Sequence, residues 1–527
     1  MASIISAVLG DLISRSISFA VDKCYYHRRR EGTLPDNLQR LRRVLLRIQA
    51  TVEEAERRRV TNQAMLRQLQ VMREGMYRGY YLLNAVDKAQ DREVSRHGHS
   101  SFALSEFNPA KRLCILSATT TAKTTTVVAS YAGREAERKL REVLVDLERM
   151  AGDMKELVLF LSGYPPLLRE PCSTYQWVEN RMFGREAEQE RIVSFLLEPP
   201  GPPGPGTQDL GVLPVFGRAR VGKSTLVEHV CCDERVRSHF STVVFFSKMI
   251  NAMDENLQLA PLGYSGAMRH RNDLASTGSS LVVIELHGDV DEGTWRRTLS
   301  TLIKGEHTAP VSKIVVTGRS EKIAGFGTVK ALELKPLPRE AFWYFFKMVA
   351  LGNTDAVEQP ELTSVSMEMA EQMEGSFTYA NVIGGLLRGN LGAPFWHRVL
   401  KRIKDHTSMH LLLFGDHPVG LMSKDRPVYL WRLPRTGGST IVAYSCYQEL
   451  SSAPQHDLPK ITAQDVHAGS ATPRGNVEIL LWRSHIPPYY SYVLRCGVRT
   501  PSSPALVSPP RKKQTRQRRR QPRRRWM

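Results

Sequence analysis

Residues 212–230 read Val-Leu-Pro-Val-Phe-Gly-Arg-Ala-Arg-Val-Gly-Lys-Ser-Thr-Leu-Val-Glu-His-Val. The apolar run that ends at Phe216 predicts a buried strand, and the apolar residues after Ser224 predict a helix. Between them, Gly217 to Thr225 has the spacing G-x-x-x-x-G-K-[ST] of a phosphate-binding loop. Strand, loop and helix in this order predict an α/β domain built on a parallel sheet.

Each residue type in the loop has a physical role. Gly217 and Gly222 permit backbone torsions and a close approach that let successive N–H groups point at phosphate oxygens. The helix that starts at Gly222 adds its positive N-terminal end. Lys223 is expected to reach the β- and γ-phosphates, and the Ser224 hydroxyl to take one Mg²⁺ position. The predicted binding set is Gly217, Val221, Gly222, Lys223, Ser224 and Thr225.

A second apolar run, Leu281 to Ile284, ends at an acid. Glu285 is therefore predicted to lie on the Mg²⁺ side of the site. Leu286 follows it and can neither orient water nor accept a proton. Asp289 and Asp291 are interpreted as solvated loop acids, so slow or absent hydrolysis is expected. No catalytic residue is assigned; Glu285 is the nearest candidate, as an acid on the Mg²⁺ side.

A third apolar run, Ile314 to Val316, is followed by Thr317, Gly318 and then Arg319. The carboxyl ends of parallel strands face the ligand crevice of such sheets. Arg319 is thus predicted to contact the terminal phosphate, with an ordinary surface arginine as the open alternative.

The apolar patterns divide the chain into five regions. Amphipathic stripes such as Leu34 to Ala55 and Ala136 to Leu161 predict a helical bundle. A Pro/Gly stretch, Pro199 to Gly206, predicts an exposed linker. The predicted fold class is multidomain α and α/β, with these regions: 1–165 helical bundle; 180–338 P-loop nucleotide-binding domain; 339–390 helical subdomain; 391–507 β-rich region of unknown fold; 508–527 disordered basic tail.

Several short segments, in order along the chain, resemble the nucleotide-binding (NB-ARC) module of plant NLR disease-resistance proteins of the coiled-coil class. These segments are Phe183 to Glu186, Gly217 to Leu226, Cys232 to Phe240, Leu281 to Glu285, Ser312 to Ser320, and Leu337 to Phe346. Gly375 to Ala380 lies where the family has its Gly-Leu-Pro-Leu motif, and the first 165 residues are similar to the family's coiled-coil domain. The resemblance covers about residues 1–390.

The resemblance implies a protein of plant defence that holds ADP at rest and exchanges it for ATP, with Mg²⁺. It places Phe183 and Arg185 near the adenine, and it implies protein partners for the N-terminal bundle. The chain departs from the family at Glu285-Leu286, where paired acids are usual, and it shows neither a Met-His-Asp motif nor leucine-rich repeats. We therefore expect a truncated NLR that acts as a switch or scaffold. An active ATPase and a nucleotide-free interaction scaffold stay open as alternatives.

The formal charge of +20 is half explained by ten Lys and Arg residues between Arg511 and Arg525. Such a segment is expected to be disordered and to attract nucleic acid without sequence specificity. A solvated tail or an artefact of the gene model is the other interpretation. Seven cysteines without a C-x-x-C pair favour a reducing compartment, the cytoplasm with the nucleus as second location. No transmembrane segment is expected; peripheral membrane contact by the opening helix is implied for some family members only.

Overall fold

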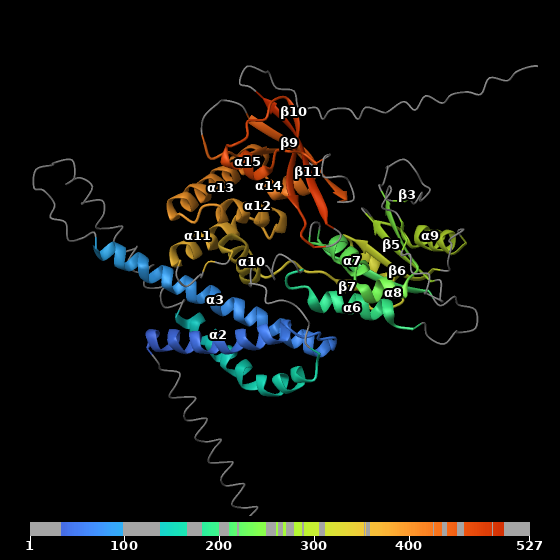
Figure 1. Ribbon diagram of the computed structural model, residues 1–527, viewed down its shortest axis with the longest axis horizontal. Coiled ribbons are helices and arrows are strands. Elements are labelled where there is room, and N and C mark those ends of the chain that lie inside the picture. Colours follow the sequence, from blue (N-terminus) through green and yellow to red (C-terminus); the bar gives the residue numbers. More distant parts are fainter. Residues whose placement is uncertain are drawn as a thin grey trace, which may run out of the picture.

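The computed structural model describes residues 33–98, 137–165, 182–199, 210–218, 221–248, 260–261, 267–269, 279–286, 289–304, 311–352, 354, 359–424, 426–434, 440–450, 458–486 and 489–499. The predictions for the opening helix, for most of the Pro/Gly linker and for the basic tail lie outside these residues. Within them, the predicted fold class is confirmed: an N-terminal helical region precedes a parallel sheet, and a small antiparallel sheet lies near the C-terminus (Figure 1).

In the described part of the N-terminal unit there are three long helices: α2 (Leu34–Glu56), α3 (Gln63–Gly98) and a helix over residues 137–162. Their apolar stripes face one another, because residues three and four apart share one side of a helix. The helices approach closely at Gly79, where an added Cβ would lie 2.6 Å from Leu45 Cδ2 and 3.0 Å from Leu147 Cδ1. Arg40 also holds Glu148 of the third helix through both carboxylate oxygens, at 2.7 and 2.8 Å.

A second unit contains the predicted parallel sheet. Its strands lie in the order β3-β2-β5-β6-β1-β7, with β4 also paired to β2; β2, β5, β6, β1 and β7 are parallel. The bounds are β1 Gly211–Phe216, β2 Thr242–Lys248, β3 Ala260–Pro261, β4 Ala267–Arg269, β5 Ser280–Leu286, β6 Val311–Gly318 and β7 Leu332–Glu333. The central strands are apolar on both faces because helical segments cover both.

On one face of this sheet, Leu213 and Val215 pack among the buried side chains of three helices, α6 (Glu186–Leu197), α7 (Lys223–Cys231) and α8 (Glu234–His239). On the other face, Val316 packs with Trp295 of α9 (Glu292–Lys304) and Ile323 of the 3₁₀ helix η3 (Glu321–Phe326). The loop that follows β1 therefore emerges at the carboxyl edge of the sheet, where α7 begins.

A group of helices follows the sheet: α10 (Arg339–Leu351), α11 (Pro360–Glu371), α12 (Phe377–Arg388), α13 (Ala393–Phe414) and α14 (Pro418–Ser423). The 22 residues of α13 correct the expectation that a β-rich region begins at residue 391. Trp396, Val399, Leu400 and Ile403 are buried at helical spacing. Pro394 lies in the first turn, and Gly415 ends the helix with a left-handed φ of +66°.

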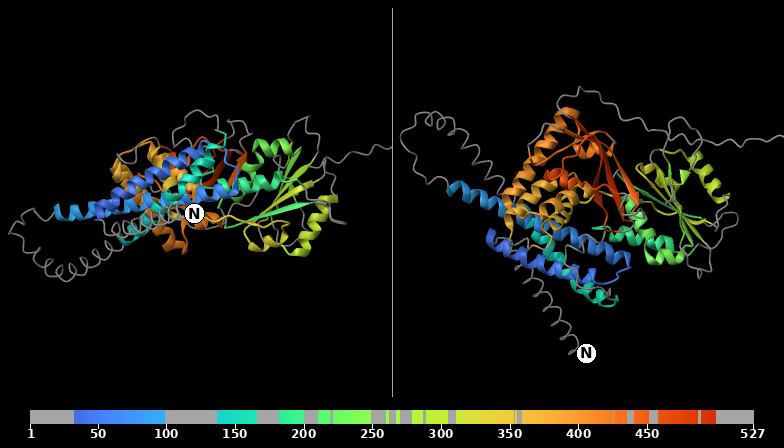
Figure 2. Two further views of the ribbon diagram at one scale, coloured as in Figure 1. Left: turned by 90° about the horizontal axis from the view of Figure 1, so that it is seen from below. Right: turned by 45° about the horizontal axis from the view of Figure 1, so that its top comes forward.

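The C-terminal unit is a four-stranded antiparallel sheet in the order β10-β11-β9-β8. Its elements are β8 Val428–Leu430, β9 Thr440–Leu450, α15 Ala463–Ala468, β10 Asn476–Arg483 and β11 Tyr490–Arg499. Val382 of α12 and Val466 of α15 are buried against Ile479 and Leu494 of this sheet. The antiparallel sheet lies between α12 and α7, beside the parallel-sheet unit (Figures 1 and 2). Among the described helices, not one is long and apolar enough to cross a membrane.

Candidate phosphate-binding site

The loop between β1 and α7 is shaped by its two outer glycines. A Cβ on Gly217 would lie 2.3 Å from the carbonyl oxygen of Leu334, so only glycine fits where the loop crosses the chain after β7. Gly222 forms the N-cap of α7 with a φ of +94°. This left-handed backbone conformation is unfavourable for residues that carry a Cβ. The first N–H groups of α7 therefore face the loop, as a phosphate-binding loop requires.

Lys223 turns back over the loop. Its Nζ donates to the carbonyl oxygens of Gly217 at 2.9 Å and Arg218 at 2.7 Å. Burial, the positive charge of Arg319 and the opposing effect of Glu285 together lower the pKa of Lys223 to about 8. The ammonium group is thus held at the loop by weak carbonyl acceptors, which phosphate oxygens would outcompete as charged acceptors.

Ser224 and Glu285 meet across the site. The Ser224 hydroxyl donates to Glu285 Oε1 at 2.7 Å, which brings the predicted Mg²⁺ ligands from α7 and β5 together. Within the described residues, no cluster of three or more His, Cys, Asp or Glu side chains could hold a metal by itself. A hydroxyl beside one carboxylate fits Mg²⁺, which takes few protein oxygens and completes its shell with water and phosphate oxygens.

These groups line a cavity of about 470 Å³ at the carboxyl edge of the parallel sheet. Val221, Gly222, Lys223, Ser224, Thr225 and Glu285 lie on its wall, together with Thr317 and Arg319 at the end of β6. The volume is in the range of small-molecule sites. Arg319 therefore lines the cavity, and its contact with a terminal phosphate stays a prediction.

The predicted adenine-side residues Phe183 and Arg185 also line the cavity, although they precede α6 and lie far from the loop in sequence. Phe183 is 4% exposed and Arg185 is 5% exposed. Arg185 Nη2 donates to the carbonyl oxygen of Lys335 at 2.6 Å, and Arg185 pairs with Glu188 at 3.3 Å. The Arg185 guanidinium is thus anchored to the chain after β7, whereas the Phe183 ring packs against Tyr77 and Phe345.

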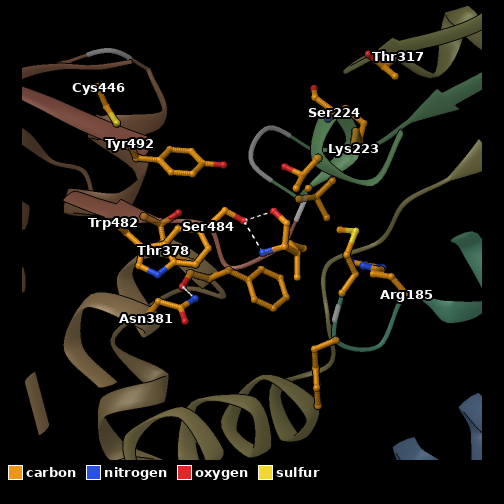
Figure 3. Close-up of a pocket in the computed structure, with 18 of the residues that line it drawn as sticks. Arg185, Lys223, Ser224, Thr317, Thr378, Asn381, Cys446, Trp482, Ser484 and Tyr492 are labelled. Atoms are coloured by element: carbon orange, nitrogen blue, oxygen red, sulfur yellow. Dashed lines mark hydrogen bonds between the residues drawn. The ribbon is translucent and has the colours of Figure 1, made fainter. Parts of the chain in front are cut away.

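Sequence reasoning missed the opposite wall of the cavity. Phe345 of α10 and Thr378 and Asn381 of α12 contribute to it, and so do residues of the C-terminal sheet: Cys446, Leu481, Trp482, Ser484, His485, Ile486 and Tyr492. Figure 3 shows Trp482, Ser484 and Tyr492 facing the side on which Lys223 and Ser224 lie. Phe345 and Thr378 lie in segments that carry the family resemblance, but their place in the cavity wall was not predicted. No sequence motif marks the residues of the C-terminal sheet, because they meet the loop only through packing of distant elements.

A polar contact joins this wall to α7. Tyr490, the first residue of β11, donates a hydrogen bond to the Glu228 carboxylate on α7. Glu228 Oε2 is buried and has no hydrogen-bond partner in the described part of the chain. Burial raises the pKa of Glu228 to about 7, the Tyr490 hydrogen bond opposes this, and the charge of Glu285 adds to it.

Comparison with known proteins gives relatives of one kind. No protein-family model matches the chain. It is 24% identical over 379 residues to "Disease resistance protein RGA2" of Solanum bulbocastanum, which covers 69% of this chain and 36% of the relative. It is 24% identical over 392 residues to "Putative disease resistance RPP13-like protein 1" of Arabidopsis thaliana, covering 71% and 35%.

A third relative, "Putative disease resistance protein RGA1" of Solanum bulbocastanum, is 25% identical over 233 residues, covering 42% of this chain and 23% of the relative. The aligned part of the chain thus spans about a third or less of the length of these relatives. The resemblance predicted from the motifs is confirmed. The relatives of the chain are plant disease resistance proteins, at about 24% identity over as much as 71% of its length.

Proposed function

We propose that this chain binds ADP or ATP with Mg²⁺ between Gly217 and Thr225, and acts in plant defence as a nucleotide-dependent switch or signalling scaffold. The observation that carries the proposal is that Lys223, Ser224 and Glu285 line one cavity. The Ser224 hydroxyl lies 2.7 Å from Glu285 Oε1. A cation, a hydroxyl and a carboxylate in this arrangement suit a magnesium-bound polyphosphate. Protein partners are assigned to the N-terminal bundle, and the location to the cytoplasm, where such nucleotides are abundant.

Weak or absent hydrolysis is part of the proposal. The residue after Glu285 is the buried, apolar Leu286, which cannot orient a water molecule. Asp289 is exposed and pairs with Lys322 at 2.7 Å, and Asp291 caps α9 by accepting from the Thr294 backbone N–H. Both acids thus have structural partners away from the phosphate loop, which favours retention of nucleotide over turnover.

Isothermal titration calorimetry of the full chain with ADP and ATP, with and without Mg²⁺, tests this function. We expect binding of both nucleotides, tighter binding with Mg²⁺, and release of phosphate slower than about one per minute, far below typical enzymes. Rapid magnesium-dependent turnover would instead support an active ATPase. No heat with either nucleotide on folded protein would leave only an interaction scaffold.

The affinity for ADP is expected to depend on pH through Lys223. Its pKa is about 8 in the free site, and a bound polyphosphate would raise it, since the anion favours the charged amine. The site therefore takes up a proton on binding above about pH 8, and affinity should fall roughly tenfold between about pH 8 and 9.5. Titrations in buffers of different ionisation enthalpy measure this uptake; constant affinity over that range would contradict it.

A further inference from the structure

The cavity has a charged end and an aromatic end. Among the described residues that line it, the charged side chains come from the parallel-sheet unit: Arg185, Lys223, Glu285 and Arg319. The described lining residues of α12 and the antiparallel sheet include no Lys, Arg, Asp or Glu. Figure 3 shows Trp482 and Tyr492 on the side of the cavity opposite Lys223. A nucleotide is divided in the same way, since its phosphates are charged and its base presents flat aromatic faces.

Trp482 of β10 and Tyr492 of β11 form the aromatic surface of this second end. The two residues are directly paired across the antiparallel strands, so their side chains lie on the same face of the sheet. Their ring centroids are 5.7 Å apart, and the planes are inclined by 29°. Both side chains are partly exposed, whereas Phe183 and Phe345, which also line the cavity, are only 4% and 5% exposed. Trp482 and Tyr492 thus keep ring surface that a ligand can contact.

Hydrogen bonds hold the strand ends next to this aromatic pair. The Ser484 backbone N–H donates to the carbonyl oxygen of Tyr490 at 2.8 Å, which joins the end of β10 to β11. The Ser484 hydroxyl donates to the Ile486 carbonyl oxygen at 3.0 Å and accepts from the Ile486 N–H at 3.3 Å. Tyr490 lies two residues before Tyr492, on the same face of β11, and donates to Glu228 of α7. The pair is therefore held beside the helix that begins at the phosphate loop, and a surface fixed in this way loses little entropy on binding.

We propose that Trp482, with Tyr492 beside it, stacks on the base of the bound nucleotide. The inference rests on the proposed nucleotide binding. Lys223 at the charged end and Trp482 at the aromatic end then hold the two ends of one ligand. The C-terminal sheet thereby supplies a base-binding surface that the phosphate loop alone does not provide.

Three variants of the full chain test the stack. Trp482→Ala removes the ring, and Trp482→Phe keeps an aromatic face. Tyr447→Ala is the matched control, because Tyr447 of β9 pairs with Val493 and so lies on the opposite face of the sheet from Tyr492. There it contacts the exposed Arg495 at 4.6 Å, and it is not among the described residues that line the cavity.

Calorimetry measures the affinity of each variant for ADP and for pyrophosphate, both with Mg²⁺, because pyrophosphate has no base. We expect Trp482→Ala to weaken ADP binding about tenfold or more, as loss of one base–aromatic stack implies. It should bind pyrophosphate within about twofold of wild type, since the charged end is unchanged. Trp482→Phe should bind ADP within about threefold of wild type. Tyr447→Ala should bind ADP within about twofold of wild type.

A second measurement locates the base in the wild-type chain, so it does not depend on the folding of any variant. The probe is 2-azido-ADP, which carries its photoreactive group on the adenine. After binding with Mg²⁺ and photolysis, mass spectrometry identifies the labelled peptide. We expect the label within residues 476–499, which span β10 and β11. A label found only outside these residues would overturn the assignment of the base.

The proposed function and the base assignment fail in different ways. A wild-type chain that binds neither ADP nor pyrophosphate overturns the proposed function. A chain that binds ADP, but whose folded Trp482→Ala variant binds it as tightly as wild type, overturns the base assignment alone. Equal losses of affinity for ADP and pyrophosphate in that folded variant would also reject the assignment, because they would show a disturbance of the phosphate end.

Discussion

Replacing Lys223 with methionine is expected to weaken ADP binding at least about 100-fold, which corresponds to about 3 kcal/mol. The ammonium group already lies at the loop, where it donates to the carbonyl oxygens of Gly217 and Arg218. Charge-assisted hydrogen bonds to phosphate are worth about 1.5–3 kcal/mol each, and methionine keeps the length of the side chain without a donor. Calorimetry with ADP and Mg²⁺ measures the loss.

Lys322→Met is the control for this change. Lys322 is an exposed lysine in η3 that pairs with Asp289, so the same charge is lost near the site without touching the loop. Its affinity for ADP should stay within about twofold of wild type. If the two variants bind ADP equally well, Lys223 does not hold the phosphates, and the assignment of the loop fails.

Glu228→Gln is expected to stabilise the protein at alkaline pH. The pKa of Glu228 is raised from 4.5 to about 7, so the folded chain retains a proton that the unfolded chain has lost between these values. The free energy of unfolding therefore falls as pH rises through that window, because the buried carboxyl group must ionise in the folded chain. Above about pH 7 this destabilisation is complete. For a half-buried side chain we expect the variant to gain about 2 kcal/mol at about pH 8.

At about pH 4.5 the same variant should match the wild type, because the carboxyl group is then protonated in the folded chain. Tyr490→Phe serves as the companion variant: it removes the hydrogen bond that lowers the pKa of Glu228, and should destabilise the chain at about pH 8. Urea unfolding at several pH values gives the comparison. A Glu228→Gln chain with the wild-type pH dependence would show that this carboxyl group is ionised normally.

Glu228 and Tyr490 also show where sequence patterns stop. Glu228 occupies a helix position that carries no motif, and Tyr490 begins a strand more than 250 residues later. Their contact depends on the C-terminal sheet folding back beside α7 (Figure 1). The same return of the chain brings Trp482, Ser484 and Tyr492 to the cavity, which local periodicity could not indicate.

The helix α13 was mispredicted for a different reason. The region after residue 390 was expected to be β-rich, although Trp396, Val399, Leu400 and Ile403 repeat at helical spacing. The signal existed in the sequence, but it merged with the short apolar runs that follow it. A long apolar stripe, as in α2, was enough to predict a helix. The choice between helix and strand was wrong after residue 390, where a helix is followed closely by short strands.

The sequence by itself determined the loop, its strand and helix, and the likeness to NLR proteins, because phosphate binding requires fixed residue types at fixed spacing along one short segment. It also placed Ser224 and Glu285 on the same edge of a sheet, since parallel strands end together. Tertiary structure alone decided that α3 packs behind Phe183 and that the C-terminal sheet walls the cavity. Those contacts arise from the burial of apolar faces, which is non-directional and leaves the choice of partner to the complete fold.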